Sequence, residues 1–312
     1  MTKALEAQLR ARAHTLLADG TVELFLGYRQ GSNPLRVAPF VARTPAETER
    51  LVWNAVCVPN LAGALRKHAA RRVGIVLKGC DARSVVALLR QNQLERSRLY
   101  ILGMTCQGMA DPAQVAAAAP GPVSGVELDD TTLVISAGGE VVRRPRSDLL
   151  LAKCATCLTP TPELYDELLG ETPPPAALPS DRFAAVRAFE ALDAPARLAF
   201  WSKELSKCTL CYACQTVCPL CYCKQCPLTL ARDDPRRQTR EPTSVFAYHV
   251  MRAYHLAGRC TGCDECERVC PENIPLSLIC RKNEQDSTPA FSAPESQDSV
   301  GCAGCGGRGE AA

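Results

Sequence analysis

The chain has 312 residues, of which 46% are hydrophobic and 22% charged, and 36 Lys and Arg against 33 Asp and Glu leave a formal net charge of +3. This balance lacks the excess of basic residues that is typical of nucleic-acid-binding proteins, so nucleic acid is not an expected partner. The length favours two domains, each large enough to bury a core of its own.

The first 20 residues, MTKALEAQLRARAHTLLADG, have the pattern of an amphipathic helix, with charged residues among Leu and Ala. They lack the apolar core of a signal peptide. No stretch reaches the roughly 18 to 20 consecutive apolar residues that a membrane span needs. The sequence therefore predicts a cytoplasmic protein with no membrane span.

Residues 1–170 alternate between strand-like and helical patterns. Strands are expected at 21–28, 71–79 and 98–106, and helices at 59–70 and 81–94. Residues 134–144, VISAGGEVVRR, are typical of a hairpin that turns at Gly138 and Gly139. The region is therefore predicted to be an α/β domain with a mixed sheet.

The second of these strands ends in a Lys78-Gly79-Cys80-Asp81 turn, and Asp81 is placed to cap the helix that follows. Open α/β sheets bind ligands where a strand leads into a helix N-terminus, because unpaired backbone N–H groups and the helix dipole favour an anion. We therefore expect a ligand site around Lys78, Gly79 and Asp81.

Four cysteines of this region have related positions. Cys80 follows one strand, Cys106 follows the next, and Cys154 and Cys157 form a C-x2-C pair before an expected helix. Alone, the C-x2-C pair is compatible with zinc, redox thiols or no function. Together the four could bind an iron-sulfur cluster, which would be the third of the chain beside the two described below. The alternative is a group of buried free cysteines.

Cysteine density marks the domain boundary, since five of the 19 cysteines lie in the first 200 residues and fourteen lie from position 208 onward. In a reducing cytosol, such density favours metal binding over disulfides. We expect a linker and helix at 171–205, a two-cluster ferredoxin domain at 206–283 and a flexible tail at 284–312.

Two motifs, CTLCYACQTVCP and CTGCDECERVCP, share the spacing of bacterial two-cluster ferredoxins. Three cysteines of each motif surround one 4Fe-4S cluster, and the fourth reaches the neighbouring cluster. Structural zinc sites more commonly combine two separate cysteine pairs, so two complete four-cysteine motifs favour clusters. The predicted ligands are Cys208, Cys211, Cys214 and Cys270 for cluster one, and Cys260, Cys263, Cys266 and Cys218 for cluster two.

The segment between the motifs, TSVFAYHVMRAYHLAG at 243–258, has helical apolar spacing with Gly258 as the C-cap. We expect His249 and His255 on this helix to be packed and hydrogen-bonded. The long helical insert resembles the α-helical ferredoxin of heterodisulfide reductase and succinate dehydrogenase iron-sulfur subunits. The second domain is therefore expected to be mainly α-helical.

The remaining cysteines leave alternatives open. Cys57 and Cys280 have no partner at a suggestive spacing and are expected to pack in cores. One interpretation of the CPLCYCKQC segment is an alternative fourth ligand in place of Cys218. A second is another metal site shared with the tail cysteines, and a third is a group of reduced thiols. The cysteines of the CPLCYCKQC segment in question are Cys221, Cys223 and Cys226, and the tail cysteines are Cys302 and Cys305.

The segments VGIVLKGCDARSVVALL, YILGMTCQG and KCATCLTPTPELYDELLG resemble the coenzyme F-420 (deazaflavin) hydrogenase and dehydrogenase beta-subunit family over residues 50–170. The resemblance implies a flavin-binding domain that holds FAD beside a 4Fe-4S cluster. By motif it implies Cys80, Cys106, Cys154 and Cys157 as ligands of that cluster, and it suggests Lys78, Gly79 and Asp81 on the flavin side.

The predicted function is that of an iron-sulfur, flavin-linked electron-transfer subunit. Its expected partners are the other redox subunits of a hydrogenase, formate dehydrogenase or heterodisulfide-reductase-like complex. No Ser-His-Asp, paired-carboxylate or Walker-type motif is present, so no catalytic residue is assigned. The alternative is a self-contained iron-sulfur flavoenzyme that reduces an organic substrate, a deazaflavin or a nicotinamide coenzyme.

Overall fold

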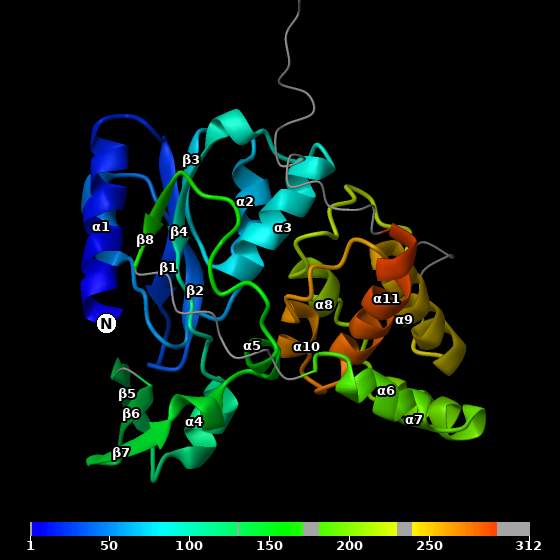
Figure 1. Ribbon diagram of the computed structural model, residues 1–312. Coiled ribbons are helices and arrows are strands. Elements are labelled where there is room, and N and C mark those ends of the chain that lie inside the picture. Colours follow the sequence, from blue (N-terminus) through cyan, green and yellow to red (C-terminus); the bar gives the residue numbers. More distant parts are fainter. Residues whose placement is uncertain (1, 130, 171–180, 230–238, 292–312) are drawn as a thin grey trace, which may run out of the picture.

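The computed structural model describes residues 2–129, 131–170, 181–229 and 239–291. The first two ranges form an α/β part and the last two a helical part, so the predicted fold class is confirmed (Figure 1). The expected linker at 171–180 and the tail cysteines Cys302 and Cys305 lie outside the described residues. No helix within the described ranges is both long and apolar enough to cross a membrane.

A five-stranded mixed sheet forms the centre of the α/β part. Its order is β2 (Val37–Ala42), β1 (Leu24–Gln30), β3 (Val73–Leu77), β4 (Leu99–Met104) and β8 (Glu167–Leu169). β1, β3, β4 and β8 run parallel, while β2 pairs antiparallel with β1. All five residues of β3 are buried, as expected for a central parallel strand that is covered on both faces.

Helices cover both faces of this sheet. α1 (Thr2–Ala18) lies on one face, and α2 (Ala62–Leu65) and α3 (Gly79–Arg90) lie on the other (Figure 1). α1 buries Leu5, Leu9 and Leu16 in the core, which confirms the predicted N-terminal helix. The helix expected at 59–70 is shorter than predicted and continues as a 3-10 turn.

A second, three-stranded antiparallel sheet follows α4 (Pro112–Ala118) and consists of β5 (Val123–Asp129), β6 (Thr132–Ala137) and β7 (Glu140–Pro145). The predicted hairpin turn is confirmed. Gly138 and Gly139 have φ values of 58° and 85°, which are the left-handed conformations that a two-residue hairpin turn requires.

The prediction of a helix after the C-x2-C pair is wrong. A short helix, α5 (Ala152–Ala155), contains Cys154, and the segment beyond it ends in strand β8 instead. The side chain of Asp166 explains the difference, since its Oδ2 accepts a hydrogen bond from the Ile101 N–H at 2.7 Å. Pairing with the edge of β4 thereby overrides the local helix propensity.

The helical part contains the elements α6 (Ala184–Glu190), α7 (Ala194–Ser206), α8 (Ala213–Thr216), α9 (Pro242–Leu256), α10 (Glu265–Arg268) and α11 (Leu276–Phe291). The C-cap of α9 is Ala257, one residue before the predicted Gly258, and Gly258 follows it with a left-handed φ of 67°. α11 extends to Phe291, so the segment that was expected to begin a flexible tail at 284 is helical at its start.

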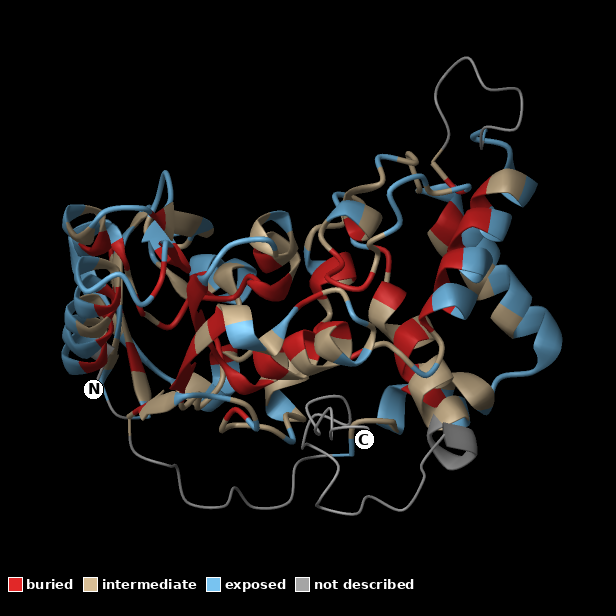
Figure 2. Cartoon of the chain, turned by 90° about the horizontal axis from the view of Figure 1, so that it is seen from above, coloured by how far each residue is buried: buried red, intermediate tan, exposed pale blue. Residues whose placement is uncertain are grey.

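The two parts share one core. Cys218, Leu220 and Leu256 belong to the same buried cluster as the residues of the central sheet. Across the boundary, Ser84 Oγ of α3 lies 2.9 Å from Thr261 Oγ1 of the second ferredoxin motif. Figure 2 shows buried segments in both parts, with exposed residues on their outer sides. The ferredoxin motifs therefore pack directly against the α/β part.

The predicted capping role of Asp81 is wrong, and the residue has another function in the fold. α3 begins at Gly79, and the Asp81 carboxylate accepts hydrogen bonds from Lys78 Nζ at 2.8 Å and from the Tyr28 hydroxyl at 3.0 Å. Lys78 also donates to the Pro59 carbonyl at 2.9 Å. These buried contacts fix the end of β3 to β1 and to the chain before α2.

The buried ion pair gives a first prediction. Asp81→Asn leaves the Lys78 ammonium, 1% exposed, without a counter-charge. We expect the free energy of unfolding to fall by roughly 3–5 kcal/mol in urea denaturation. The matched control is Asp129→Asn, which removes the exposed partner of Arg143 and should change stability by less than about 1 kcal/mol. Equal losses in both variants would contradict this interpretation.

Candidate iron-sulfur centres

The two ferredoxin motifs are copies in three dimensions as well as in sequence. In each one, the residues on both sides of the second cysteine have left-handed backbone conformations. Their φ values are 52° for Leu210, 59° for Tyr212, 62° for Gly262 and 53° for Asp264. L-residues seldom adopt this conformation, so its use at equivalent positions shows that both loops are wound in the same tight way. The one-turn helices α8 and α10 follow them.

The predicted ligands of cluster one, called here the first thiol set, line a single cavity. Its members are Cys208, Cys211, Cys214 and Cys270. Burial raises the pKa of Cys208, and the nearby thiolates of the three other members raise it further. Because Cys270 belongs to the second motif, the cavity brings the two motifs together in the predicted crossed manner.

The second thiol set is Cys260, Cys263, Cys266 and Cys218. Burial raises the pKa of Cys263 well above its usual value, and the neighbouring Cys218 and Cys260 contribute to this shift. Cys280 is buried as predicted, but it also hydrogen-bonds to Cys260 and Cys266 and lowers the pKa of Cys266 to about 7. No spacing in the sequence indicates this contact, because α11 brings Cys280 to the set.

Polar groups surround the first thiol set. The Leu210 N–H donates to Cys208 Sγ at 3.4 Å, and His249 Nε2 lies 3.3 Å from the same sulfur. Burial lowers the pKa of His249 to about 4, so the ring is neutral and its predicted packed role is confirmed. His255 is exposed, and its predicted packed role is wrong. Hydrogen bonds to sulfur tune the potential of a cluster.

Arg252 of α9 is a buried cation between the two sets. Its Nη2 donates to the Cys214 carbonyl at 3.1 Å. Burial alone would lower the pKa of Arg252, yet the neighbouring thiolates, led by Cys266 and Cys214, raise it above its usual value. The guanidinium therefore supplies positive charge next to both sets.

The N-terminal cysteines also converge. Cys106 N–H donates to the Pro160 carbonyl at 2.8 Å, so the loop after Cys157 lies against the end of β4. The same loop lies against the start of α3, because a Cβ added to Gly79 would clash with the Thr159 carbonyl oxygen. The C-x2-C loop therefore covers the ends of two adjacent strands.

These four cysteines, Cys80, Cys106, Cys154 and Cys157, are called here the N-terminal thiol set. Burial raises the pKa of Cys106 to about 12, with further contributions from Cys154 and Cys157. Cys106 in turn adds to the rise in the pKa of Cys80, which burial dominates. The structure thus brings into one neighbourhood the four residues that the sequence grouped together.

Lys153 connects this set to the second thiol set, and sequence reasoning missed it. Its Nζ donates to the Cys263 carbonyl at 2.6 Å and lies 3.7 Å from Glu265 Oε1, with both side chains buried. Burial would lower the pKa of Lys153, but Cys80, Glu265 and Cys263 raise it. A single buried ammonium therefore contacts the second set and lies near the N-terminal set.

The donor chemistry of the three thiol sets suits clusters. Among the described residues, no three His, Cys, Asp or Glu side chains gather tightly enough to hold one metal ion. Thiolates that bind four different iron atoms of a cube need not converge on a single point. The donor set, which consists entirely of cysteines in a largely buried environment, fits an iron-sulfur cluster.

The residues predicted to face a flavin do not fit that role. Lys78 and Asp81 are 1% and 0% exposed and are paired with each other, with Tyr28 and with a carbonyl group. Gly79 is covered by the Thr159 carbonyl. The packing assigns all three to the core and leaves a flavin no accessible side chain at this turn.

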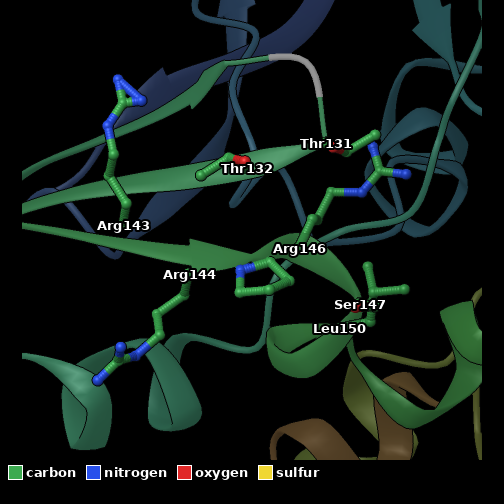
Figure 3. Close-up of a pocket in the computed structure, with 8 residues that line it drawn as sticks. Thr131, Thr132, Arg143, Arg144, Arg146, Ser147 and Leu150 are labelled. Carbon is green, nitrogen blue, oxygen red and sulfur yellow. The ribbon is translucent and has the colours of Figure 1, made fainter.

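A wide groove of about 690 Å³ lies beside the three-stranded sheet and is lined by Arg143, Arg144 and Arg146. Figure 3 shows Arg143 and Arg144 pointing in different directions, and Arg146 donates to Gln107 Oε1 at 2.7 Å. Because the guanidinium groups do not converge, the groove is not a built anion site.

Comparison with known proteins agrees with the thiol geometry. Residues 204–274 match the family described as the 4Fe-4S dicluster domain, and the chain is therefore an iron-sulfur protein.

Two curated relatives extend the similarity over most of the chain. The F420-dependent formate dehydrogenase subunit beta of Methanocaldococcus jannaschii is 21% identical over 85% of this chain and 84% of its own length. The F420-dependent formate dehydrogenase 1 subunit beta of Methanococcus maripaludis is 20% identical over 78% of each. The resemblance to F420-linked beta subunits that was predicted from the sequence is confirmed.

A solved structure is similar over a smaller region. It is a chain of the F420-reducing [NiFe] hydrogenase complex from Methanosarcina barkeri, with a TM-score of 0.38 and 15% identity. The match covers 50% of this chain and 58% of that chain.

The close approach at Gly79 gives a second prediction. Gly79→Ala should push the loop after Cys157 away from β3 and lower the free energy of unfolding by about 1–3 kcal/mol, measured by chemical denaturation. Gly125→Ala is the control, since its added Cβ would meet Ser136 at an ordinary 3.7 Å. If Gly79→Ala is as stable as the unmodified chain, the loop does not pack as described.

Proposed function

We propose that the chain is an electron-transfer subunit of a multi-subunit F420-dependent oxidoreductase of the formate dehydrogenase or hydrogenase class. Pairwise contacts between the three thiol sets support the proposal. Lys153 lies beside the N-terminal set and contacts the second set, and crossed motifs join the second set to the first. Closely spaced redox centres are what a protein needs in order to conduct electrons.

In this proposal the first and second thiol sets each hold one 4Fe-4S cluster, and the N-terminal set holds a third. Such clusters accept and release single electrons, at potentials set by net charge, hydrogen bonds to sulfur and solvent exposure. The crossed arrangement assigns Cys270 to the first cluster and Cys218 to the second. No residue of the chain is assigned acid, base or nucleophile chemistry.

The surrounding residues would tune these potentials. Backbone and side-chain donors near Cys208 stabilise negative charge on its sulfur. Arg252 and Lys153 add buried positive charge beside the thiolates, which favours the more negative, reduced form of a cluster. The chain itself would thus set the order in which electrons occupy the three sites.

The proposed partners are the other redox subunits of the complex, because both curated relatives are named as beta subunits of formate dehydrogenases. A cytoplasmic location stays a prediction. FAD was implied by family resemblance, but its predicted contacts are occupied by core interactions, so the proposal assigns no step to a flavin. Flavin content is tested directly by extraction and absorbance.

Activity of the isolated chain distinguishes the proposal from a self-contained flavoenzyme. We expect anaerobically purified protein to exchange single electrons with viologen dyes. F420, which is reduced by hydride, should be reduced only after a catalytic partner subunit, its substrate and a hydride-transferring flavin are added. Reduction of F420, a nicotinamide or an organic substrate by the isolated chain with a simple electron donor would favour the self-contained enzyme instead.

Iron content tests the N-terminal thiol set. If the N-terminal set holds a cluster, Cys154→Ser with Cys157→Ser should lower iron and labile sulfide by about four atoms each. Cys57→Ser is the matched control, because Cys57 is fully buried and belongs to none of the three thiol sets. Unaltered iron and sulfide in the double variant would refute the third cluster.

Electron paramagnetic resonance tests the crossed ligation. Cys208→Ser and Cys270→Ser should alter the same low-temperature signal, although the residues lie in different motifs. Cys263→Ser and Cys218→Ser should alter a second signal together. If each signal instead responds to substitutions within one motif only, every motif binds its own cluster and the crossed assignment is wrong.

A further inference from the structure

A cavity of about 200 Å³ in the helical part is lined by the three cysteines of the CPLCYCKQC segment that belong to none of the thiol sets. They are Cys221, Cys223 and Cys226, and α9 contributes Arg252 and His255 to the same walls. This cavity is called here the C-terminal thiol cavity. A water molecule occupies about 30 Å³ in the liquid, so the volume suits an occupant larger than one ion.

The charge of the lining favours an anionic occupant. Arg252 and Arg259 both line the cavity, and none of the described residues around it carries a carboxylate. Arg259 is held in place, because its guanidinium lies over the Tyr222 ring at 5.2 Å and donates to Gln91 Oε1 at 2.7 Å. Thiolates and an iron-sulfur core carry net negative charge, which these cations would balance.

One donor at the cavity has no partner within the described part of the chain. It is Nε of Arg252, a residue only 5% exposed. A buried donor without an acceptor destabilises the fold. The missing acceptor at a cavity rich in thiols indicates that an anionic ligand completes it.

We propose that the C-terminal thiol cavity binds a further iron-sulfur cluster through Cys221, Cys223 and Cys226, with His255 as the fourth ligand. Histidine replaces cysteine as a ligand in some iron-sulfur centres. The proposal adds a site to the electron-transfer function and uses none of the twelve cysteines assigned there.

The location links the new site to the second thiol set. Cys221 N–H donates to the Cys218 carbonyl at 3.2 Å, and the two side chains are hydrogen-bonded to each other. A cluster here would therefore lie beside a ligand of the second cluster. Since Cys223 is exposed, the site also lies near the protein surface, where electrons are exchanged with another protein.

The test uses the full chain, purified and reconstituted with iron and sulfide under anaerobic conditions. Cys223→Ser combined with Cys226→Ser should lower iron and labile sulfide by about four atoms each and remove one paramagnetic signal. The signals lost in Cys208→Ser and Cys263→Ser should persist in this variant, which separates the new site from the ferredoxin clusters. Unchanged iron, or the loss of a single zinc ion with full iron, would overturn the proposal.

Two single variants, Cys223→Ser and His255→Gln, separate loss of a ligand from misfolding of the chain. Cys223→Ser alone replaces an exposed residue and should remove or alter the same signal, whereas the core control Cys57→Ser should not. His255→Gln should change the spectrum and potential of this signal only, and an unaltered spectrum would remove His255 from the ligand set. If Cys223→Ser keeps every signal and all the iron, Cys223 is not a ligand and the proposed site fails.

Discussion

The contact between Lys153 and the Cys263 loop is the interaction on which the arrangement of thiols depends. Lys153 follows the three-stranded sheet of the α/β part, and it donates to a carbonyl of the second ferredoxin motif at 2.6 Å. A buried ammonium must find acceptors and negative charge, because desolvation without them costs several kcal/mol. Meeting that need fixes the N-terminal thiol set against the second set.

Buried positive charge recurs wherever thiols gather. Lys78 lies under the strand end that leads to Cys80, Lys153 lies beside Cys263, and Arg252 lies between the first and second sets. Dense thiolates repel one another at the low dielectric of a protein interior, and buried cations offset this repulsion. The formal net charge of +3 conceals this pattern, because the cations that matter are the few that are buried.

The ends of β3 and β4 position the thiols of Cys80 and Cys106, and they form no accessible site for an anion. The turn after β3 has the position at which parallel sheets commonly bind ligands. Here the loop after Cys157 covers that turn, and the Lys78–Asp81 pair is saturated by Tyr28 and a carbonyl group. Cys80 and Cys106 therefore lie near each other at these strand ends, while Lys78 and Asp81, which were expected to contact a flavin, lie in the core.

Spacing and local conformation were decided by the sequence itself. The two four-cysteine motifs, the apolar strand Val73–Leu77 and the Gly138-Gly139 turn depend on residues within a few positions of each other, so their patterns can be recognised directly. Tertiary structure alone decided the rest. Asp166 turned an expected helix into strand β8, α11 brought Cys280 to Cys260 and Cys266, and Asp81 found Lys78 and Tyr28 instead of the helix terminus. Each of these outcomes depends on elements far apart in the chain, whose approach is set by burial of a common core and by the pairing of charges within it.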